Sequence, residues 1–189
     1  MVKIGLPPHI PVWKKVLSNF EGQPNIDYLE IGVYEGGSLL WLLENILTHP
    51  TSTATAIEPF VKGNLLTNLK MSGLKHKVEI IEGYSQIELK NLPSSSFDII
   101  YVDGDHHYTA TLTDAILSWP LLKTGGILIF DDYGHLCKDV DFCYPDDKPK
   151  EAIDNFVSRY SNYVDIIHVG YQFIIRKKDR IYWEKDKLF

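Results

Sequence analysis

The chain has 189 residues, of which 44% are hydrophobic and 23% charged, and its net charge is −6 at pH 7. That composition predicts one soluble globular domain over residues 1–189. The negative charge disfavours a nucleic-acid partner, and the lack of a long apolar run disfavours a membrane span or membrane partner. The N-terminal residues lack the apolar core of a signal peptide, which predicts a cytoplasmic protein.

Short apolar runs alternate with helical patterns along the chain. The first helix is predicted at residues 12–20, within an N-terminal helical segment that covers residues 1–24. Five strands are predicted at residues 26–32, 52–59, 77–83, 97–104 and 125–132, and five helices at residues 36–47, 61–73, 85–92, 108–123 and 149–161. Gly73 predicts the end of its helix, and Ser85 is predicted to be an N-cap.

The chain ends with two apolar runs around Gly170, which are typical of a closing hairpin. Gln172 interrupts the second run, and the pattern leaves open whether it faces the core or an edge. Alternation of strands and helices predicts an α/β fold with a doubly wound, mostly parallel sheet of about seven strands. Its helices are expected on both faces, and its last hairpin is expected to be antiparallel. Ligands of such sheets bind at the carboxyl ends of the strands.

The loop after the first predicted strand contains the pattern Glu-x-Gly-x-x-x-Gly, formed by Glu30, Gly32 and Gly36. Glycine lets the backbone turn tightly beside a ligand, and the next helix offers free N–H groups. Tyr34 occupies the second glycine position of a dinucleotide turn, so NAD is disfavoured and Tyr34 is expected to be a packing residue. Glu58 ends the second strand, where a carboxylate can accept hydrogen bonds from ribose hydroxyls.

These features resemble class I S-adenosylmethionine-dependent methyltransferases, which share a Rossmann-like fold. Residues 82–86 at the exit of the third strand are similar to the segment that lies along the adenine in that class. The resemblance covers the chain from Asp27 onward and implies S-adenosylmethionine as the cofactor. It implies cofactor contacts at Glu30, Gly32, Gly36, Glu58, Gly83, Ser85 and Asp103.

Acidic residues end the fourth and fifth predicted strands. Asp103 ends the fourth strand, and Asp131 and Asp132 end the fifth. Because the carboxyl tips of adjacent parallel strands lie about 5 Å apart, these side chains are expected to converge. Three carboxylates without a cation would repel one another, whereas Mg²⁺ prefers oxygen ligands. The sequence therefore predicts a metal site, for which the other reading is an ordinary charged turn.

The pattern formed by these acids and His106 resembles that of the metal-dependent O-methyltransferases. Macrolide-sugar (macrocin/mycinamicin-type) enzymes have Asp-x-x-His with an acid pair, as Asp103, His106, Asp131 and Asp132 do here. The catechol-type layout has a lysine where this chain has His106. The resemblance implies Mg²⁺ or another divalent cation at Asp103, Asp131 and Asp132, and His106 as the catalytic base. It implies methylation of a hydroxyl on a small molecule such as a sugar or secondary metabolite.

Two other functions remain open on the sequence alone. One is a metal-independent methyltransferase of the same fold, and the other is a non-catalytic adenosyl-binding module. Asp105 either orients His106 or is a solvated turn residue. His107 is expected to be a surface residue or the start of the next helix, with no role in the site.

Residues 133–149 are predicted to form an active-site loop, with Tyr133, Phe142 and Tyr144 as possible substrate walls. Cys137 and Cys143 are expected to be free thiols, and a disulfide between them is the alternative. A second subunit of a homo-oligomer could complete the acceptor pocket.

Overall fold

A computed structural model describes residues 10–135 and 144–179. Its seven-stranded sheet has the order β3-β2-β1-β4-β5-β7-β6. The strands are β1 (Asp27–Ile31), β2 (Thr53–Glu58), β3 (Val78–Glu82), β4 (Phe97–Val102), β5 (Leu122–Phe130), β6 (Val164–Val169) and β7 (Phe173–Lys177). Neighbouring strands from β3 to β5 are parallel, whereas β7 is antiparallel to both β5 and β6. The predicted mostly parallel sheet with an antiparallel last hairpin is therefore confirmed.

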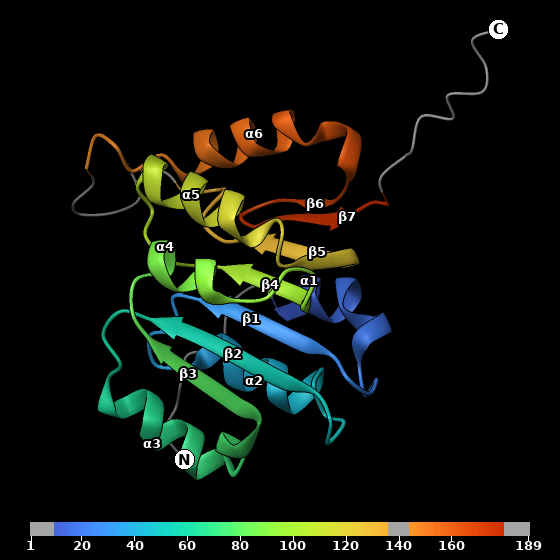
Figure 1. Ribbon diagram of the computed structural model, residues 1–189, viewed down its shortest axis with the longest axis vertical. Helices are drawn as coiled ribbons and strands as arrows, with labels where there is room; N and C mark the ends of the chain where they lie inside the picture. Colours follow the sequence, from blue (N-terminus) through green and yellow to red (C-terminus); the bar gives the residue numbers. More distant parts are fainter. Residues whose placement is uncertain (1–9, 136–143, 180–189) are drawn as a thin grey trace, which may run out of the picture.

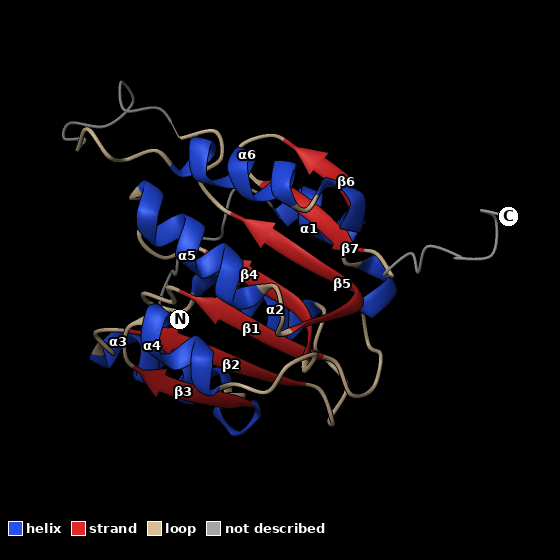
Figure 2. Ribbon diagram, turned by 45° about the horizontal axis from the view of Figure 1, so that its top comes forward, coloured by secondary structure: helices blue, strands red, loops and turns tan. Residues whose placement is uncertain are grey.

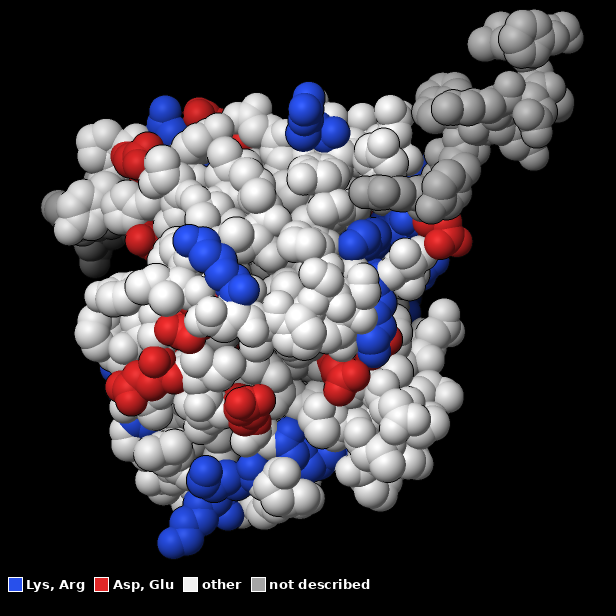
Figure 3. All heavy atoms as spheres, viewed as in Figure 1, with Lys and Arg blue, Asp and Glu red and all other residues white. Residues whose placement is uncertain are grey.

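Helices cover both faces of the sheet (Figures 1 and 2). One face carries α1 (Ile10–Val16), α2 (Gly37–Asn45) and α3 (Gly63–Ser72), and the other carries α4 (Ser85–Glu88), α5 (Tyr108–Ser118) and α6 (Pro149–Arg159). Two hydrophobic clusters fill the spaces between helices and sheet. Figure 3 shows acidic and basic side chains scattered together over the face that α4, α5 and α6 cover. None of the helices in the described ranges is long and apolar enough to cross a membrane.

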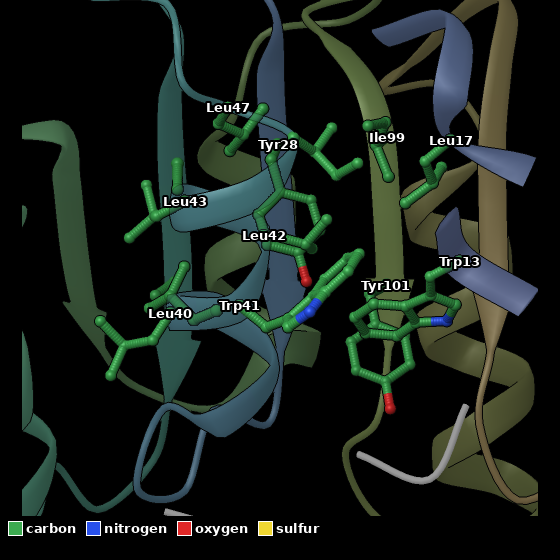
Figure 4. Close-up of a cluster of buried hydrophobic side chains, with 14 of the residues drawn as sticks. Trp13, Leu17, Tyr28, Leu40, Trp41, Leu42, Leu43, Leu47, Ile99 and Tyr101 are labelled. Atoms are coloured by element: carbon green, nitrogen blue, oxygen red, sulfur yellow. The ribbon is translucent and has the colours of Figure 1, made fainter. Parts of the chain in front are cut away.

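Trp13 anchors α1 to the sheet. Its ring packs edge to face on Tyr101 of β4, at 5.0 Å between centroids, and on Trp41 of α2, at 5.7 Å (Figure 4). Trp13 and Tyr101 are both almost completely buried. The seven-residue helix α1 is too short to be stable alone, so this packing is what holds it in place.

Several predicted boundaries differ from the structure. The helix predicted at residues 108–123 ends at Ser118, because Pro120 cannot continue the helical hydrogen bonding, and β5 already begins at Leu122. The helix predicted at residues 85–92 is one α-turn followed by a 3₁₀ turn. The predicted N-cap at Ser85 is wrong, since its hydroxyl donates to Asp114 Oδ1 instead. Gly73 ends α3 in a left-handed conformation, as predicted.

Candidate active site

Gly32 brings the loop after β1 against the loop after β4. Its φ is +81°, and a Cβ atom at this position would lie 2.0 Å from the carbonyl oxygen of Asp103. Only glycine combines this conformation with so close an approach of two backbones. The two strand ends can therefore border one common pocket.

A pocket of about 480 Å³ lies at the carboxyl ends of β1, β2 and β4. It is lined by Ile31, Gly32, Tyr34, Ile57, Glu58, Pro59, Phe60, Tyr84, Ser85, Gln86, Asp103, Gly104 and Asp105. Four of the seven residues predicted to contact the cofactor are among them, namely Gly32, Glu58, Ser85 and Asp103. The structure thus brings most of the predicted contacts to one cavity, at the edge that the sheet topology favours for ligands.

Glu30, Gly36 and Gly83 do not line this pocket. Gly36 lies at the start of α2, where a Cβ would lie 2.8 Å from Leu65 Cδ1, and a Cβ on Gly83 would contact Glu88. In this structure these two glycines therefore lie against neighbouring side chains and do not face the pocket.

Glu30 is completely buried beneath the pocket. Its carboxylate accepts hydrogen bonds from the Tyr28 hydroxyl, at 2.7 Å, and from the Ser38 hydroxyl. Burial raises the pKa of Glu30 to about 7, although both hydrogen bonds act in the opposite direction. In this structure Glu30 joins β1 to the first turn of α2 and does not face the cavity.

Glu58 organises the loop after β1. Its Oε2 accepts hydrogen bonds from the backbone N–H groups of Val33 and Tyr34, at 3.0 and 2.9 Å, and its Oε1 accepts one from Phe60 at 3.2 Å. The loop that was expected to contact a ligand is therefore fixed by the carboxylate that was expected to bind the ribose.

Three exposed aromatic side chains lie on the pocket rim. Tyr34 is 61% exposed with a φ of +49°, so the expectation that it is a packing residue is wrong. Phe60 and Tyr84 make an edge-to-face contact at 6.1 Å beside it. Phe60 was not predicted as a site residue, and Tyr84 lies within the segment compared with the adenine-contacting one but was not named as a contact. This rim offers flat apolar surfaces on which a planar ring can stack.

Acidic side chains converge where β4 and β5 end. One ligand atom from each of Asp103, His106 and Asp132 can be chosen so that all three lie within 4.8 Å of one another. Burial, followed by repulsion from Asp131 and Asp132, raises the pKa of Asp103 to about 9. His106 Nε2 lies 2.9 Å from Asp132 Oδ2, and this hydrogen bond raises the pKa of His106. Burial would raise the pKa of Asp132, but its hydrogen bonds with His106 and Tyr171 lower it below its usual value.

Two residues of the last hairpin contact the acid pair. The Tyr171 hydroxyl donates to Asp132 Oδ1 at 2.7 Å, and Gln172 Nε2 donates to Asp131 Oδ1 at 2.9 Å. Asp131 is the predicted metal ligand that the three-residue group does not include. Tyr171 and Gln172 were missed as site residues. The one available signal was the polar Gln172 inside an apolar run of the sequence.

Asp105 pairs with His107 and not with His106. Asp105 Oδ1 accepts a hydrogen bond from the backbone N–H of His107 at 3.0 Å and lies 2.5 Å from its Nδ1. The His107 ring also contacts the Tyr144 ring in a tilted arrangement, at 5.4 Å between centroids, and its backbone forms a β-bridge to Asp147. His107 therefore attaches the described end of the predicted loop to the start of α5. Residues 136–143 of that loop, with Cys137, Phe142 and Cys143, lie outside the described residues.

Comparison with known proteins gives one family match. A family model described as a methyltransferase domain matches residues 29–133. An uncharacterized protein of Acanthamoeba polyphaga mimivirus is 32% identical over 136 residues, which are 66% of this chain and 59% of that protein. A catechol O-methyltransferase of Mycobacterium tuberculosis is 24% identical over 106 residues, 55% of this chain and 46% of that enzyme. The matched region thus spans only about half of each relative.

The fold also matches solved structures. One is the MycE methyltransferase from the mycinamycin biosynthetic pathway, in complex with Mg, SAH (S-adenosylhomocysteine) and mycinamycin VI. It superposes with a TM-score of 0.68 at 16% identity and covers 95% of this chain and 52% of that one.

Proposed function

We propose, from the premise that the chain belongs to the methyltransferase-domain family, that it is an S-adenosylmethionine-dependent O-methyltransferase of small molecules. The class I S-adenosylmethionine-dependent fold supports the cofactor assignment, and the acid cluster with His106 supports the type of reaction. The observation that carries the proposal is the convergence of Asp103, His106 and Asp132 beside the pocket.

The pocket lined by Gly32, Glu58 and Ser85 is the proposed cofactor site. The exposed rings of Phe60 and Tyr84 suit the adenine, and the Glu58 carboxylate at the end of β2 suits the ribose hydroxyls. Asp103 lines this pocket and also belongs to the acid cluster. The cofactor and the reacting oxygen would therefore meet at Asp103.

The donor set fits a hard divalent cation. Carboxylate oxygens are the ligands that Mg²⁺ prefers, and burial together with the neighbouring acids Asp131 and Asp132 raises the pKa of Asp103. Asp103 and Asp132 would hold the cation, with Asp131 as a third acid beside them. A bound cation would act as a Lewis acid that lowers the pKa of an acceptor hydroxyl.

His106 is the proposed base. Its ring follows β4 by four residues and its Nε2 already contacts a carboxylate of the cluster. A neutral imidazole in this place would accept the proton of the acceptor hydroxyl, and Asp132 would stabilise the resulting imidazolium. The protein would then align the acceptor oxygen with the sulfonium methyl group. In displacement reactions of this kind, much of the rate acceleration comes from such alignment.

The names of the similar proteins support a small hydroxylated acceptor. One is a catechol O-methyltransferase, and another was solved with Mg, SAH and mycinamycin VI. A sugar or secondary metabolite with adjacent oxygens is therefore the acceptor class we would screen first.

A metal-independent methyltransferase is the second candidate. It is favoured by the contacts of Asp132, whose two oxygens each have a protein partner, His106 and Tyr171. In that case the acids would only orient His106.

Calorimetric titration of S-adenosylhomocysteine, followed by turnover of diol acceptors with and without EDTA, tests both candidates. We expect micromolar binding, activity that EDTA abolishes, and its recovery with excess Mg²⁺. His106→Ala should reduce turnover about 100-fold or more while S-adenosylhomocysteine affinity changes less than threefold. Full turnover in EDTA would favour the metal-independent enzyme, and failure to bind S-adenosylhomocysteine would reject both.

A further inference from the structure

Gln172 connects α1 to the acid cluster through the interior of the protein. Its side chain, 1% exposed, lies just before β7. Its Oε1 accepts a hydrogen bond from Trp13 Nε1 at 2.6 Å. Its Nε2 donates to Asp131 Oδ1 at 2.9 Å and lies 3.5 Å from the Tyr101 hydroxyl.

The chemistry of Trp13 determines which way the amide of Gln172 points. An indole nitrogen can only donate, so the amide atom that faces it must be the oxygen. The amide NH₂ group is then directed to the opposite side, toward Asp131. The Trp13 ring packs against Trp41 and Tyr101 (Figure 4), so the orientation of the amide depends on this aromatic packing.

Asp131 needs such a restraint because a cation site requires several neighbouring acids to be ionised together, and ionised carboxylates this close repel one another. It is the strongest source of repulsion acting on Asp103, and it also acts on Glu30. A carboxylate in this position lowers its energy by turning away from the other acids. The buried N–H donor of Gln172, next to the first residue of β7, opposes that rotation, as partners of metal ligands commonly do.

We propose that Gln172 is a positioning residue that holds the Asp131 carboxylate at the acid cluster, and that Trp13 fixes the amide in the donating orientation. This inference rests on the proposed function, because it concerns the affinity of the same cluster for a divalent cation. It assigns a role in the site to α1, which lies outside the segment matched by the family model.

The test is Mg²⁺ affinity, measured by calorimetry on protein saturated with S-adenosylhomocysteine. Gln172→Leu removes the donor and should weaken Mg²⁺ binding about 10-fold or more. Trp13→Phe keeps the aromatic packing, removes the indole N–H and should weaken binding about 3- to 5-fold. The double variant should equal Gln172→Leu within about twofold, because the N–H that Trp13→Phe removes donates to Gln172.

Trp41→Phe is the matched control, since it makes the same change in the same aromatic cluster. It should leave Mg²⁺ affinity within twofold, and S-adenosylhomocysteine affinity should stay within twofold in every variant. If Gln172→Leu does not fold, Trp13→Phe against Trp41→Phe still decides the question. Equal Mg²⁺ affinity in these two variants, with wild-type protein that binds Mg²⁺, overturns the inference and leaves the proposed function intact. Wild-type protein that binds S-adenosylhomocysteine but no Mg²⁺ overturns both the inference and the metal-dependent reaction.

Discussion

His106 and Asp132 meet at 2.9 Å, although they come after different strands. The candidate base is therefore held by a candidate metal ligand, while the second oxygen of Asp132 is held by Tyr171. Asp132 has a φ of +55°, an unusual conformation for a residue other than glycine. His106 and Tyr171 thus each hold one oxygen of this carboxylate, on a residue whose backbone has a positive φ.

Asp132→Asn should weaken Mg²⁺ binding about 10-fold or more, because the amide replaces a charged oxygen that faces the cluster. Asp105→Asn is the control, since Asp105 contacts His107 and belongs to no part of the three-residue group. Calorimetric Mg²⁺ titration of both variants checks the prediction. Equal affinities for the two would remove Asp132 from the proposed metal site.

Glu58→Gln should weaken S-adenosylhomocysteine binding about 10-fold, since it weakens the acceptor of three loop N–H groups and the proposed ribose contact. Glu82→Gln provides the comparison, because Glu82 is the register partner of Glu58 on β3 and is exposed. It should leave affinity within twofold. An unchanged affinity in Glu58→Gln would place the ribose elsewhere.

Gly32→Ala should destabilise the fold by at least about 3 kcal/mol, or abolish soluble expression, because the new methyl group collides with the backbone of Asp103. Gly73→Ala separates this collision from the cost of positive φ alone. Gly73 has a φ of +75° and nothing within 4 Å of the added Cβ, so its substitution should cost about 1 kcal/mol. Urea unfolding of both variants measures the difference.

Glu30→Gln should change how stability depends on pH. The pKa of Glu30 is about 7 in the folded protein, well above its ordinary value of 4.5, so the folded state retains a proton that the unfolded chain has released. Stability is therefore lost as pH rises from about 4.5 to 7, by roughly 3 kcal/mol for this group. The variant lacks that loss, so its stability relative to wild type should increase across this range. Urea unfolding at pH 4.5 and 7.5 tests the sign. A constant difference between the two proteins at both pH values would contradict it.

The sheet and the position of the site could be predicted because both depend on local pattern. Apolar runs such as residues 97–102 define buried strands, and the topology of parallel strands brings the loops at their carboxyl ends to one edge. The convergence of the acids that follow β4 and β5 could therefore be predicted from the sequence.

The orientation of individual side chains could not be predicted, because it depends on contacts between distant segments. Glu30 faces α2 because Ser38 and Tyr28 donate to it, and nothing in the loop pattern distinguishes this from a contact with a ligand. Tyr34 is turned outward by a loop whose N–H groups are held by Glu58, 24 residues later. Gln172 reaches Asp131 across 41 residues of sequence.

The direction of β7 decides which parts of the chain can influence the acids. Since β7 runs against β5, it enters the sheet at the edge that β5 leaves, and the residues before it lie beside Asp131 and Asp132. The region matched by the family model ends at residue 133, so it contains the acids without the hairpin that contacts them. In a relative that has the same acids but a different hairpin, the carboxylates of those acids would be oriented differently. Acceptor preference would then diverge between family members whose acidic motifs are identical.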